Sequence, residues 1–547
     1  MAGKSFSLSP KFSKINSQAC GASQQCYAIN VYRRLIGLRR SLIQLVWIPQ
    51  NRWVPIIDPL KKLRLILKKA ISLGGEIKLI ETMMVQFAQR RAFLRRRING
   101  LSPTARIPSE ILTEIFQTAC QLVDDDHKQA VTPLFIGSIC RLWRDIAWST
   151  PLLWNTILLH VSQKRHGGKL QLLGDWLLRA RTAPLFIKLT AEDEHESIDC
   201  AFQAIMQVLV TRSHYWHTFD SLLPPQCHHI FKNINFPMLT SVSVHPPKST
   251  ISTFNTPPDM FLTAPKLLDV DLSGYNFAFM VLPWEQVRRF RTQLLTVTEC
   301  LKVLQQSPNL QECHLEHVYS PDSFTSKTIT LHAQLKHLDV MLIKATSMSL
   351  FDSITLPSLS HLRIHYSGPE KLLLSSITSL VLRSSCKLER FTVEKYQFED
   401  ADLISCLEAI PSLTHLHLEM LGFANPDMGL TRQFVASLDP LSNPSQFLLP
   451  NLKYFEYKGR VLCDCHTMVD MLAHRWHLSD DRTCQNISGV SRLKLAEILS
   501  TVRYHVSADV QEELRKLSEE GMLIRIESLV PTADSVLGAI RHNTLIF

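Results

Sequence analysis

At 547 residues the chain is too long for one ordinary hydrophobic core, so we expect two or more domains. An apolar content of 45% and a charged content of 20% are typical of a folded protein and exclude a disordered one. The formal charge of +10 is concentrated at the N-terminus. Residues 1–105 carry 19 Lys and Arg against 3 Asp and Glu, which leaves 40 basic and 46 acidic residues beyond them. Nucleic-acid binding would therefore rest on the N-terminus alone, where aromatic residues are sparse, and we do not expect it.

The thirteen cysteines follow no framework spacing, which is typical of a protein in a reducing compartment. We therefore expect the cytoplasm, the nucleus or both. No run of 18 apolar residues occurs, so a membrane span is not expected. Residues 1–57 are predicted to be a disordered or poorly specified basic segment.

A helical hairpin is predicted for residues 58–100. Asp58-Pro59 has the form of a helix start, and Gly74-Gly75 predicts its end. From Glu76 to Ile98 the apolar residues alternate at three and four, with Arg91 in one seam position, over barely three heptads. The pattern favours a short antiparallel hairpin or coiled coil. The basic run Arg95-Arg96-Arg97 is more typical of a solvated helix face than of a nucleic-acid contact.

Two or three short apolar helices are predicted between Arg106 and Trp154. Pro108 opens the first, and Ile111, Leu112, Ile115 and Phe116 are expected to share one face. Thr132-Pro133 predicts a second start, and Ser149-Thr150-Pro151 a stop. About 45 residues cannot bury this many apolar side chains by themselves, so these helices need a partner surface.

The stretches IPSEILTEIF and ICRLWRDIAWSTPLLW resemble an F-box, in the F-box-like form of large fungal families. The resemblance covers Arg106 to about Trp154 and departs from the family in Ile107 and in a longer insert, about Gln117 to Thr132. It implies an F-box-like domain at residues 101–160 that docks on a Skp-type adaptor and, through it, on a cullin ubiquitin ligase. The adaptor-binding residues would be Pro108, Ile111, Leu112, Ile115, Phe116, Ile139, Cys140 and Trp143. The alternative is that these helices are an ordinary core element.

An internal repeat, L-x-x-Φ-x-Φ with Φ apolar, follows within residues 161–547. Its instances start at Leu239, Leu267, Val287, Leu310, Leu335, Leu359, Leu388, Leu413 and Leu452. They are 20 to 29 residues apart except for the last gap of 39, which predicts an inserted loop after Leu413. Six of these starts have proline two residues before them, which keeps the preceding chain out of a helix. Helices are expected between strands, including TECLKVLQQ with Thr298 as cap, and MLIRIE near the C-terminus is expected as a closing strand. The pattern resembles an irregular leucine-rich-repeat horseshoe, so the fold class is α+β or α/β: helical hairpin, small all-α domain, then solenoid with a C-terminal cap.

Alternation along each repeat strand sends the Φ residues inward and the residues between them to the concave face. The concave, substrate-facing residues are therefore predicted to be Asp269, Asp271, Arg289, Arg291, Glu312, His314, His337, Asp339, His361, Arg363, Arg390, His415, His417, Tyr454 and Glu456. Such a surface either recruits a protein partner or is a solvated polar face.

Chemical sites have little support in the sequence. The best metal candidate is Cys463-Asp-Cys465-His466 with His474, His477 and Cys484 nearby, but a C-x-C pair is weaker than the usual zinc spacing. None of the common nucleotide-binding or hydrolase motifs occurs. We expect no catalytic residues, no cofactor and no metal, and therefore not an enzyme. The sequence favours a substrate-recognition subunit of a Skp–cullin–F-box ligase that holds an unknown protein substrate; the alternative is a repeat scaffold that acts without a ligase.

Overall fold

The structure is a computed structural model of the full chain. It describes residues 57–121, 126–161, 166–191, 196–222, 229–246, 261–275, 277, 281–320, 329–368, 373–395, 399–420, 429–442, 447–477, 490–502, 504, 506–528 and 543–546. The predicted disorder of residues 1–57 lies, apart from its last residue, outside these ranges. Two compact units are present, Met1–Ile98 and Asn99–Phe547. No helix in the described ranges is long and apolar enough to cross a membrane.

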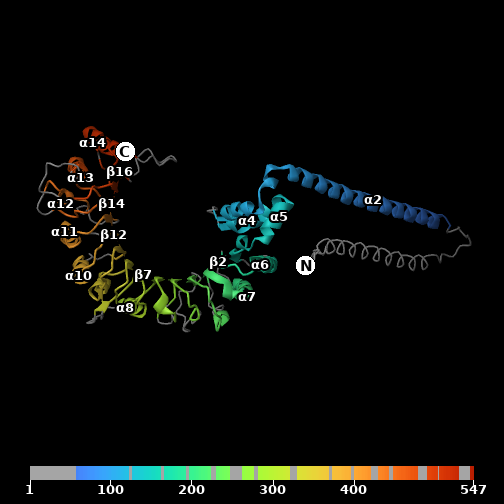
Figure 1. Cartoon of the computed structure of the whole chain (residues 1–547), viewed down its shortest axis with the longest axis horizontal. Coiled ribbons are helices and arrows are strands. Elements are labelled where there is room, and N and C mark those ends of the chain that lie inside the picture. The colour runs from blue at the N-terminus through green and yellow to red at the C-terminus, as the bar shows by residue number, and fades with distance from the viewer. Residues whose placement is uncertain are drawn as a thin grey trace, which may run out of the picture. The chain divides into compact units, whose positions relative to one another are not determined.

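A single helix, α2 (Ile57–Leu101), fills the described part of the first unit (Figure 1). The predicted hairpin is therefore wrong, because Gly74 and Gly75 lie inside a continuous helix. No atom lies within 4 Å of the position that a Cβ would take at either glycine. Each glycine costs only about 1 kcal/mol relative to alanine, and the flanking residues are good helix formers. The apolar seam also passes through the glycine pair in phase, since Leu73 and Ile80 are seven residues apart.

Three short helices begin the second unit. They are α3 (Ser109–Gln121), α4 (Asp126–Ile139) and α5 (Arg141–Ser149), with 3₁₀ turns at Pro103–Arg106 and Pro151–Leu153. The predicted restart at Thr132-Pro133 is wrong, because α4 begins at Asp126 and holds Pro133 in its interior. A proline in a helix interior removes one backbone hydrogen bond and crowds the carbonyl four residues earlier, at a cost of about 3 kcal/mol. The residues from Pro133 to Ser149 belong to two helices rather than one. Cys140 between them has an extended backbone, and its side chain caps α5 by accepting a hydrogen bond from the Trp143 N–H at 3.5 Å.

A tryptophan cluster joins these helices to the sheet that follows. The Trp154 ring is fully buried and lies 5.2 Å from Trp148 and 4.6 Å from Trp176, both edge-on. Its Nε1 donates to the Ala147 carbonyl at 2.7 Å, and the Arg179 guanidinium lies 4.6 Å from its ring centre. Trp176 belongs to α6 (His166–Ala180) and donates to the Thr156 carbonyl of the first strand. The helices and the first strand are thus packed as one body.

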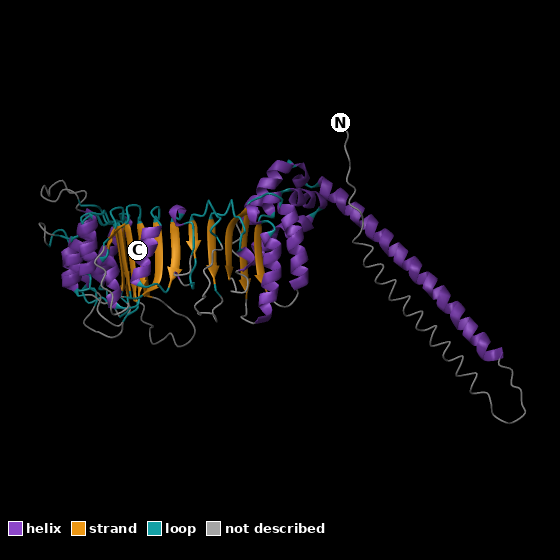
Figure 2. Ribbon diagram, turned by 90° about the horizontal axis from the view of Figure 1, so that it is seen from below, coloured by secondary structure: helices purple, strands orange, loops and turns teal. Residues whose placement is uncertain are grey.

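A sheet of 15 strands forms the rest of the unit, and Figure 2 shows the strands standing side by side. Its strands, in spatial and chain order, are β1 (Thr156–Val161), β2 (Leu185–Ala191), β3 (Trp216–Leu222), β4 (Ser241–His245), β5 (Asp269–Asp271), β6 (Arg289–Gln293), β7 (Glu312–Val318), β9 (His337–Leu342), β11 (His361–Tyr366), β12 (Arg390–Glu394), β13 (His415–Glu419), β14 (Tyr454–Gly459), β15 (Leu495–Ser500), β16 (Leu523–Ser528) and β17 (Asn543–Ile546). All neighbours pair in parallel except β17, which is antiparallel to β16. A separate pair joins β8 (Thr330–Leu331) to β10 (Ile354–Thr355). This is an α/β solenoid of parallel strands.

The helices that connect the strands lie on the convex side of the curved sheet (Figure 1). They are α7 (Glu196–Val210), α8 (Val297–Gln306), α9 (Ser349–Asp352), α10 (Ser375–Ser384), α11 (Asp400–Glu408), α12 (Arg432–Leu438), α13 (Cys465–His477) and α14 (Ala508–Glu519). In α8 the cap is Thr296 rather than the predicted Thr298, because Thr296 and Glu299 form a reciprocal capping box.

The repeat template is confirmed in all nine predicted instances, because each strand begins two residues after its Leu or Val. These nine starting residues are each at most 1% exposed, and the Φ residues after them are buried. The template missed β3 and β15, whose inward residues include Ser221 and Ala496 instead of large apolar ones. It also placed the solenoid boundary at residue 161, whereas the sheet begins with β1 at Thr156. MLIRIE is a strand as predicted, but β17 pairs beyond it.

The 39-residue gap contains an additional helix, α12, and a loop pinned by a buried arginine. Arg475 of α13 is 0% exposed and donates to the carbonyls of Leu438 at 2.6 Å, Leu449 at 3.1 Å and Leu448. Burial lowers the pKa of Arg475 to about 10, so the guanidinium stays charged at neutral pH. The Arg475 side chain therefore anchors the predicted insertion to the core of the solenoid.

Replacing Gly137 of α4 by alanine should destabilise the second unit by about 1 to 3 kcal/mol, because the new Cβ would overlap the Trp148 ring. Its ideal position lies 1.7 Å from Cζ3 of that ring. Gly174→Ala in α6, where nothing lies within 4 Å, is the matched control and should stabilise the chain by about 0.5 to 1 kcal/mol. Urea denaturation checks both values; equal stability of the two variants would contradict this packing.

Arg475→Ala should cost about 3 to 5 kcal/mol, since three buried carbonyls lose a charged donor together. Arg432→Ala, whose side chain is 77% exposed, should stay within about 0.5 kcal/mol of the parent. Thermal and chemical denaturation of the full chain measure the difference. A loss under 1 kcal/mol for Arg475→Ala would show that the loop is held by other contacts.

Candidate functional site

The predicted adaptor-binding residues of α3 divide into two stripes. Leu112 and Phe116 are each 2% exposed, and the Phe116 ring packs 5.0 Å from that of Trp143. Ile111 and Ile115 are 47% and 48% exposed. The prediction that all four share one docking face is therefore wrong for Leu112 and Phe116, which form the core of the three-helix unit. Successive residues are about 100° apart on a helix, and the packing of α4 and α5 against α3 decides which stripe is covered.

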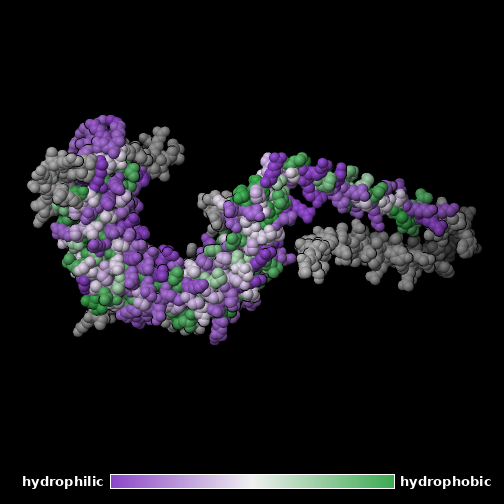
Figure 3. Space-filling model, in the orientation of Figure 1, coloured by the Kyte–Doolittle hydropathy of each residue, from purple (hydrophilic) through white to green (hydrophobic). Residues whose placement is uncertain are grey.

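Further apolar side chains are exposed on the next two helices. Phe135, Ile139 and Leu142 follow one another at intervals of four and three across the junction of α4 and α5, and all are exposed. Pro108 is exposed as well, whereas Trp143 and Cys140 are half-buried and serve the internal packing and the α5 cap. Figure 3 shows hydrophobic atoms at the surface in this part of the second unit. Contiguous exposed apolar patches are typical of interaction surfaces, whereas single exposed apolar side chains are common on any folded protein.

The concave face of the sheet carries the predicted polar residues in columns. Strand register places one column through Asp269, Arg289, Glu312, His337, His361, Arg390, His415 and Tyr454, and a second through Asp271, Arg291, His314, Asp339, Arg363, Thr392, His417 and Glu456. Every predicted residue is at least partly exposed, while its strand neighbours are buried. The structure therefore brings the predicted set together on one face, where Figure 3 shows mostly hydrophilic atoms.

Opposite charges on neighbouring strands pair along these columns. Two nitrogens of the Arg289 guanidinium donate hydrogen bonds to the Asp269 carboxylate, and the distance from Nε to Oδ1 is 2.7 Å. Arg363 Nη2 lies 2.7 Å from Glu394 Oε1, and His314 Nδ1 lies 3.3 Å from Asp339 Oδ2. Each exposed pair is worth roughly 0 to 1 kcal/mol, so the pairs contribute little to stability. They do order the side chains that a partner would meet.

A third column lies beyond the predicted two and was missed. It contains His365, Glu394, Glu419 and Lys458 on β11 to β14. The signal was available, because the same alternation places the next outward residue one position past the end of the template. Its carboxylates are less exposed than those of the other columns, at 14% for Glu394 and 15% for Glu419.

Two imidazole rings lie against each other at a tilt near the middle of the concave face. The rings of His337 and His361 lie 4.1 Å apart, and His337 Nδ1 is 3.6 Å from Glu312 Oε1. Partial burial, then the charges of His337 and Arg390, lower the pKa of His361 below its ordinary value of 6.5. The face therefore gains positive charge at this position only in acid.

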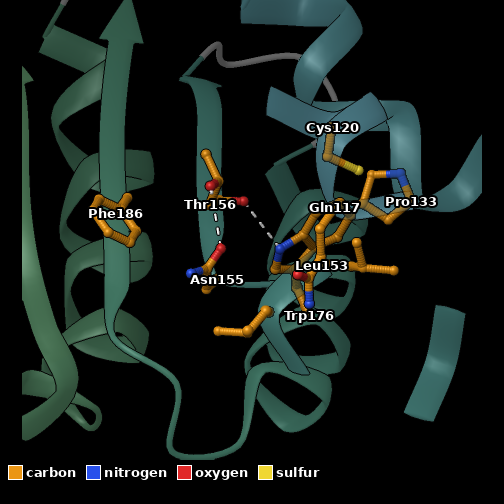
Figure 4. A pocket seen from close by; sticks show the side chains of 9 residues that line it. Gln117, Cys120, Pro133, Leu153, Asn155, Thr156, Trp176 and Phe186 are labelled. Carbon is orange, nitrogen blue, oxygen red and sulfur yellow. Dashed lines mark hydrogen bonds between the residues drawn. The ribbon is translucent and has the colours of Figure 1, made fainter. Parts of the chain in front are cut away.

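A cavity of about 270 Å³ lies where α3 and α4 meet the first strands (Figure 4). It is lined by Gln117, Cys120, Pro133, Leu152, Leu153, Asn155, Thr156, Trp176 and Phe186. Burial raises the pKa of the Cys120 thiol to about 11, so the thiol stays protonated and offers no nucleophile at neutral pH. The residues that line the cavity lie where the helices pack against the first strands of the sheet.

The cysteine and histidine group near residue 463 does not converge. Cys463 is buried, whereas His466 is exposed and pairs with Asp509 at 2.9 Å. His474 pairs with Asp439, and His477 lies 3.6 Å from Glu520. Cys484 lies outside the described residues. Cys465 Sγ lies 3.7 Å from His466 Nδ1, but the other described members of this candidate metal site have separate partners.

No protein-family model matches the chain, and no curated protein matches it. Among solved structures, the chain is similar to one described as the crystal structure of the Rad7 and Elc1 complex in yeast. The similarity has a TM-score of 0.32 at 12% identity and covers 71% of this chain and 90% of that one. A likeness this distant carries no argument about function, and the fold described above is established by the sheet itself.

His361 should titrate below pH 6.5 in the full chain, and His337→Gln should raise its pKa toward that value by removing a neighbouring positive charge. Because the folded pKa lies below the unfolded one, this histidine makes folding less stable as the pH falls through about 6.5. Proton–nitrogen NMR of the imidazole ring measures the pKa. Arg525→Gln, at the far end of the sheet, is the control and should leave it unchanged; titration of His361 above 6.5 would refute the arrangement.

Proposed function

We propose that this chain is a non-enzymatic substrate-recognition subunit of a Skp–cullin–F-box ubiquitin ligase. The three helices α3 to α5 would dock on a Skp-type adaptor, and the concave face would hold a protein substrate. The observation that carries the proposal is the pair of exposed isoleucines, Ile111 and Ile115, on a helix whose other apolar stripe is already buried.

The exposed stripe fits a helical adaptor surface because its residues recur at helical spacing. Ile111 and Ile115 are one turn apart on α3, and Phe135, Ile139 and Leu142 extend the exposed apolar surface of the unit. Burying half of an isoleucine side chain stabilises a complex by about 1 kcal/mol, so several together support a specific interface. The F-box-like pattern of the sequence supports the adaptor as the partner.

Substrate recruitment is supported by the columns of charged and aromatic groups on the concave face. Adjacent strands present these side chains about 4.8 Å apart, which gives a partner a regular set of contacts. The tryptophan cluster around Trp154 packs the docking helices against the first strand of the same sheet. A bound substrate would therefore be held at a defined position from the adaptor, which raises its local concentration near the ligase.

A ligase-independent scaffold is the second candidate. It is favoured by Ile107, which departs from the F-box pattern, and by the burial of Leu112 and Phe116 within the chain itself. A scaffold would use the same concave face without recruiting an adaptor or a cullin.

The test is co-expression of the full chain with a Skp-type adaptor, followed by purification and quantification of the bound adaptor. Ile111→Asp with Ile115→Asp should weaken binding at least tenfold, because two carboxylates would have to be buried at the interface. Leu112→Asp is unsuitable, since it would disrupt the core of the helices.

Leu382→Asp on α10 is the matched control, because this residue is 64% exposed and lies on a convex helix of the solenoid. It should bind the adaptor as the parent does. Undiminished binding by the folded double variant would contradict the docking surface, and a parent chain that recovers partners but no adaptor would establish the scaffold instead.

A further inference from the structure

Three metal-ligating side chains converge on the concave face between β12 and β13. One carboxylate oxygen each of Glu394 and Glu419 and one imidazole nitrogen of His417 all lie within 4.8 Å of one another. Glu394 and Glu419 are register partners on neighbouring strands. His417 lies two residues before Glu419, so alternation turns both toward the same face.

A fourth residue orients the histidine of this group. His417 Nδ1 lies 2.7 Å from Glu456 Oε2 on β14, and that hydrogen bond lowers the pKa of the Glu456 carboxyl. The other ring nitrogen, Nε2, is buried and has no hydrogen-bond partner in the described part of the chain. A histidine held at one nitrogen by a carboxylate, with the other nitrogen free, is the usual arrangement of a metal ligand. An unpaired buried nitrogen is otherwise costly, so a ligand at Nε2 would remove a defect.

Cations now balance the two carboxylates. Lys458 Nζ lies 2.8 Å from Glu419 Oε1, and Arg363 Nη2 lies 2.7 Å from Glu394 Oε1. His365 Nδ1 approaches Glu394 at 3.2 Å, and its Nε2 is also buried without a partner in the described chain. A divalent ion would take the place of Lys458 at Glu419 while Arg363 kept Glu394 oriented. The two positive side chains therefore weaken binding without blocking it.

We propose that Glu394, His417 and Glu419 bind a first-row divalent metal ion, with Glu456 positioning the imidazole. One imidazole and two carboxylates suit Zn²⁺ better than Mg²⁺, which prefers oxygen ligands and keeps its water. Three protein ligands leave an open coordination position toward the concave face. The site does not depend on the ligase role, because a scaffold would present the same surface.

Isothermal titration of the full chain with Zn²⁺ tests the site, with Mg²⁺ as the comparison ion. His417→Gln and Glu394→Gln should each remove one equivalent of bound Zn²⁺, and Glu456→Gln should weaken that equivalent 10- to 100-fold. Lys458→Met should strengthen it, because the competing cation is gone. Any zinc held by cysteines elsewhere would persist in all four variants.

His415→Gln is the matched control, since His415 lies on the same strand and face but stacks on Tyr454 at 4.1 Å. It should bind Zn²⁺ as the parent does, and circular dichroism should show that every variant is folded. Equal zinc binding by the parent and His417→Gln, or weaker binding by Lys458→Met, would overturn the proposal.

Discussion

The structure depends on the stacking of strand–helix units that cannot bury their apolar residues alone. Each repeat contributes a leucine or valine at its first position and two or three further inward side chains, and these contact only the neighbouring units. The ends of such a stack need cover. At the first strand, Trp154 and Trp176 supply it, and Trp176 also satisfies the Thr156 carbonyl. At the other end, β17 pairs along β16 in the antiparallel sense.

The concave surface is a direct consequence of the same alternation. A strand that buries every second residue must turn the residues between them toward the concave face. These positions therefore become columns of charged and polar side chains across the sheet. Most of these charges are paired with a neighbouring strand, as Arg289 is with Asp269 and Arg363 with Glu394. The charges around His417 are paired as well, but there the buried ring nitrogens of His365 and His417 have no hydrogen-bond partner among the described residues. That local imbalance distinguishes the metal-site candidate from the ordinary ion pairs around it.

In the proposed function, helices α3 to α5 and the concave face would act together because they are parts of one packed unit. Gly137 allows the Trp148 ring to lie against α4, and Trp148 in turn contacts Trp154 at the start of the sheet. The boundary expected at residue 161 is therefore not a linker between two domains. The sheet already begins before it, with β1 at Thr156. In the proposed ligase role, this packing would set the distance between adaptor and substrate.

The repeat strands and their concave residues could be predicted from the sequence, because alternation and the spacing of L-x-x-Φ-x-Φ are local properties. Short apolar helices between Arg106 and Trp154 were also predicted, as was the insertion after Leu413, but the break between α4 and α5 at Cys140 was not. The sequence alone could not decide that Leu112 and Phe116 are covered while Ile111 and Ile115 are exposed. Both stripes are apolar, and only the packing of α4 and α5 against α3 separates them. The convergence of Glu394, His417 and Glu419 was likewise decided by tertiary structure, because strands 25 residues apart in the chain become neighbours only when the sheet sets their register.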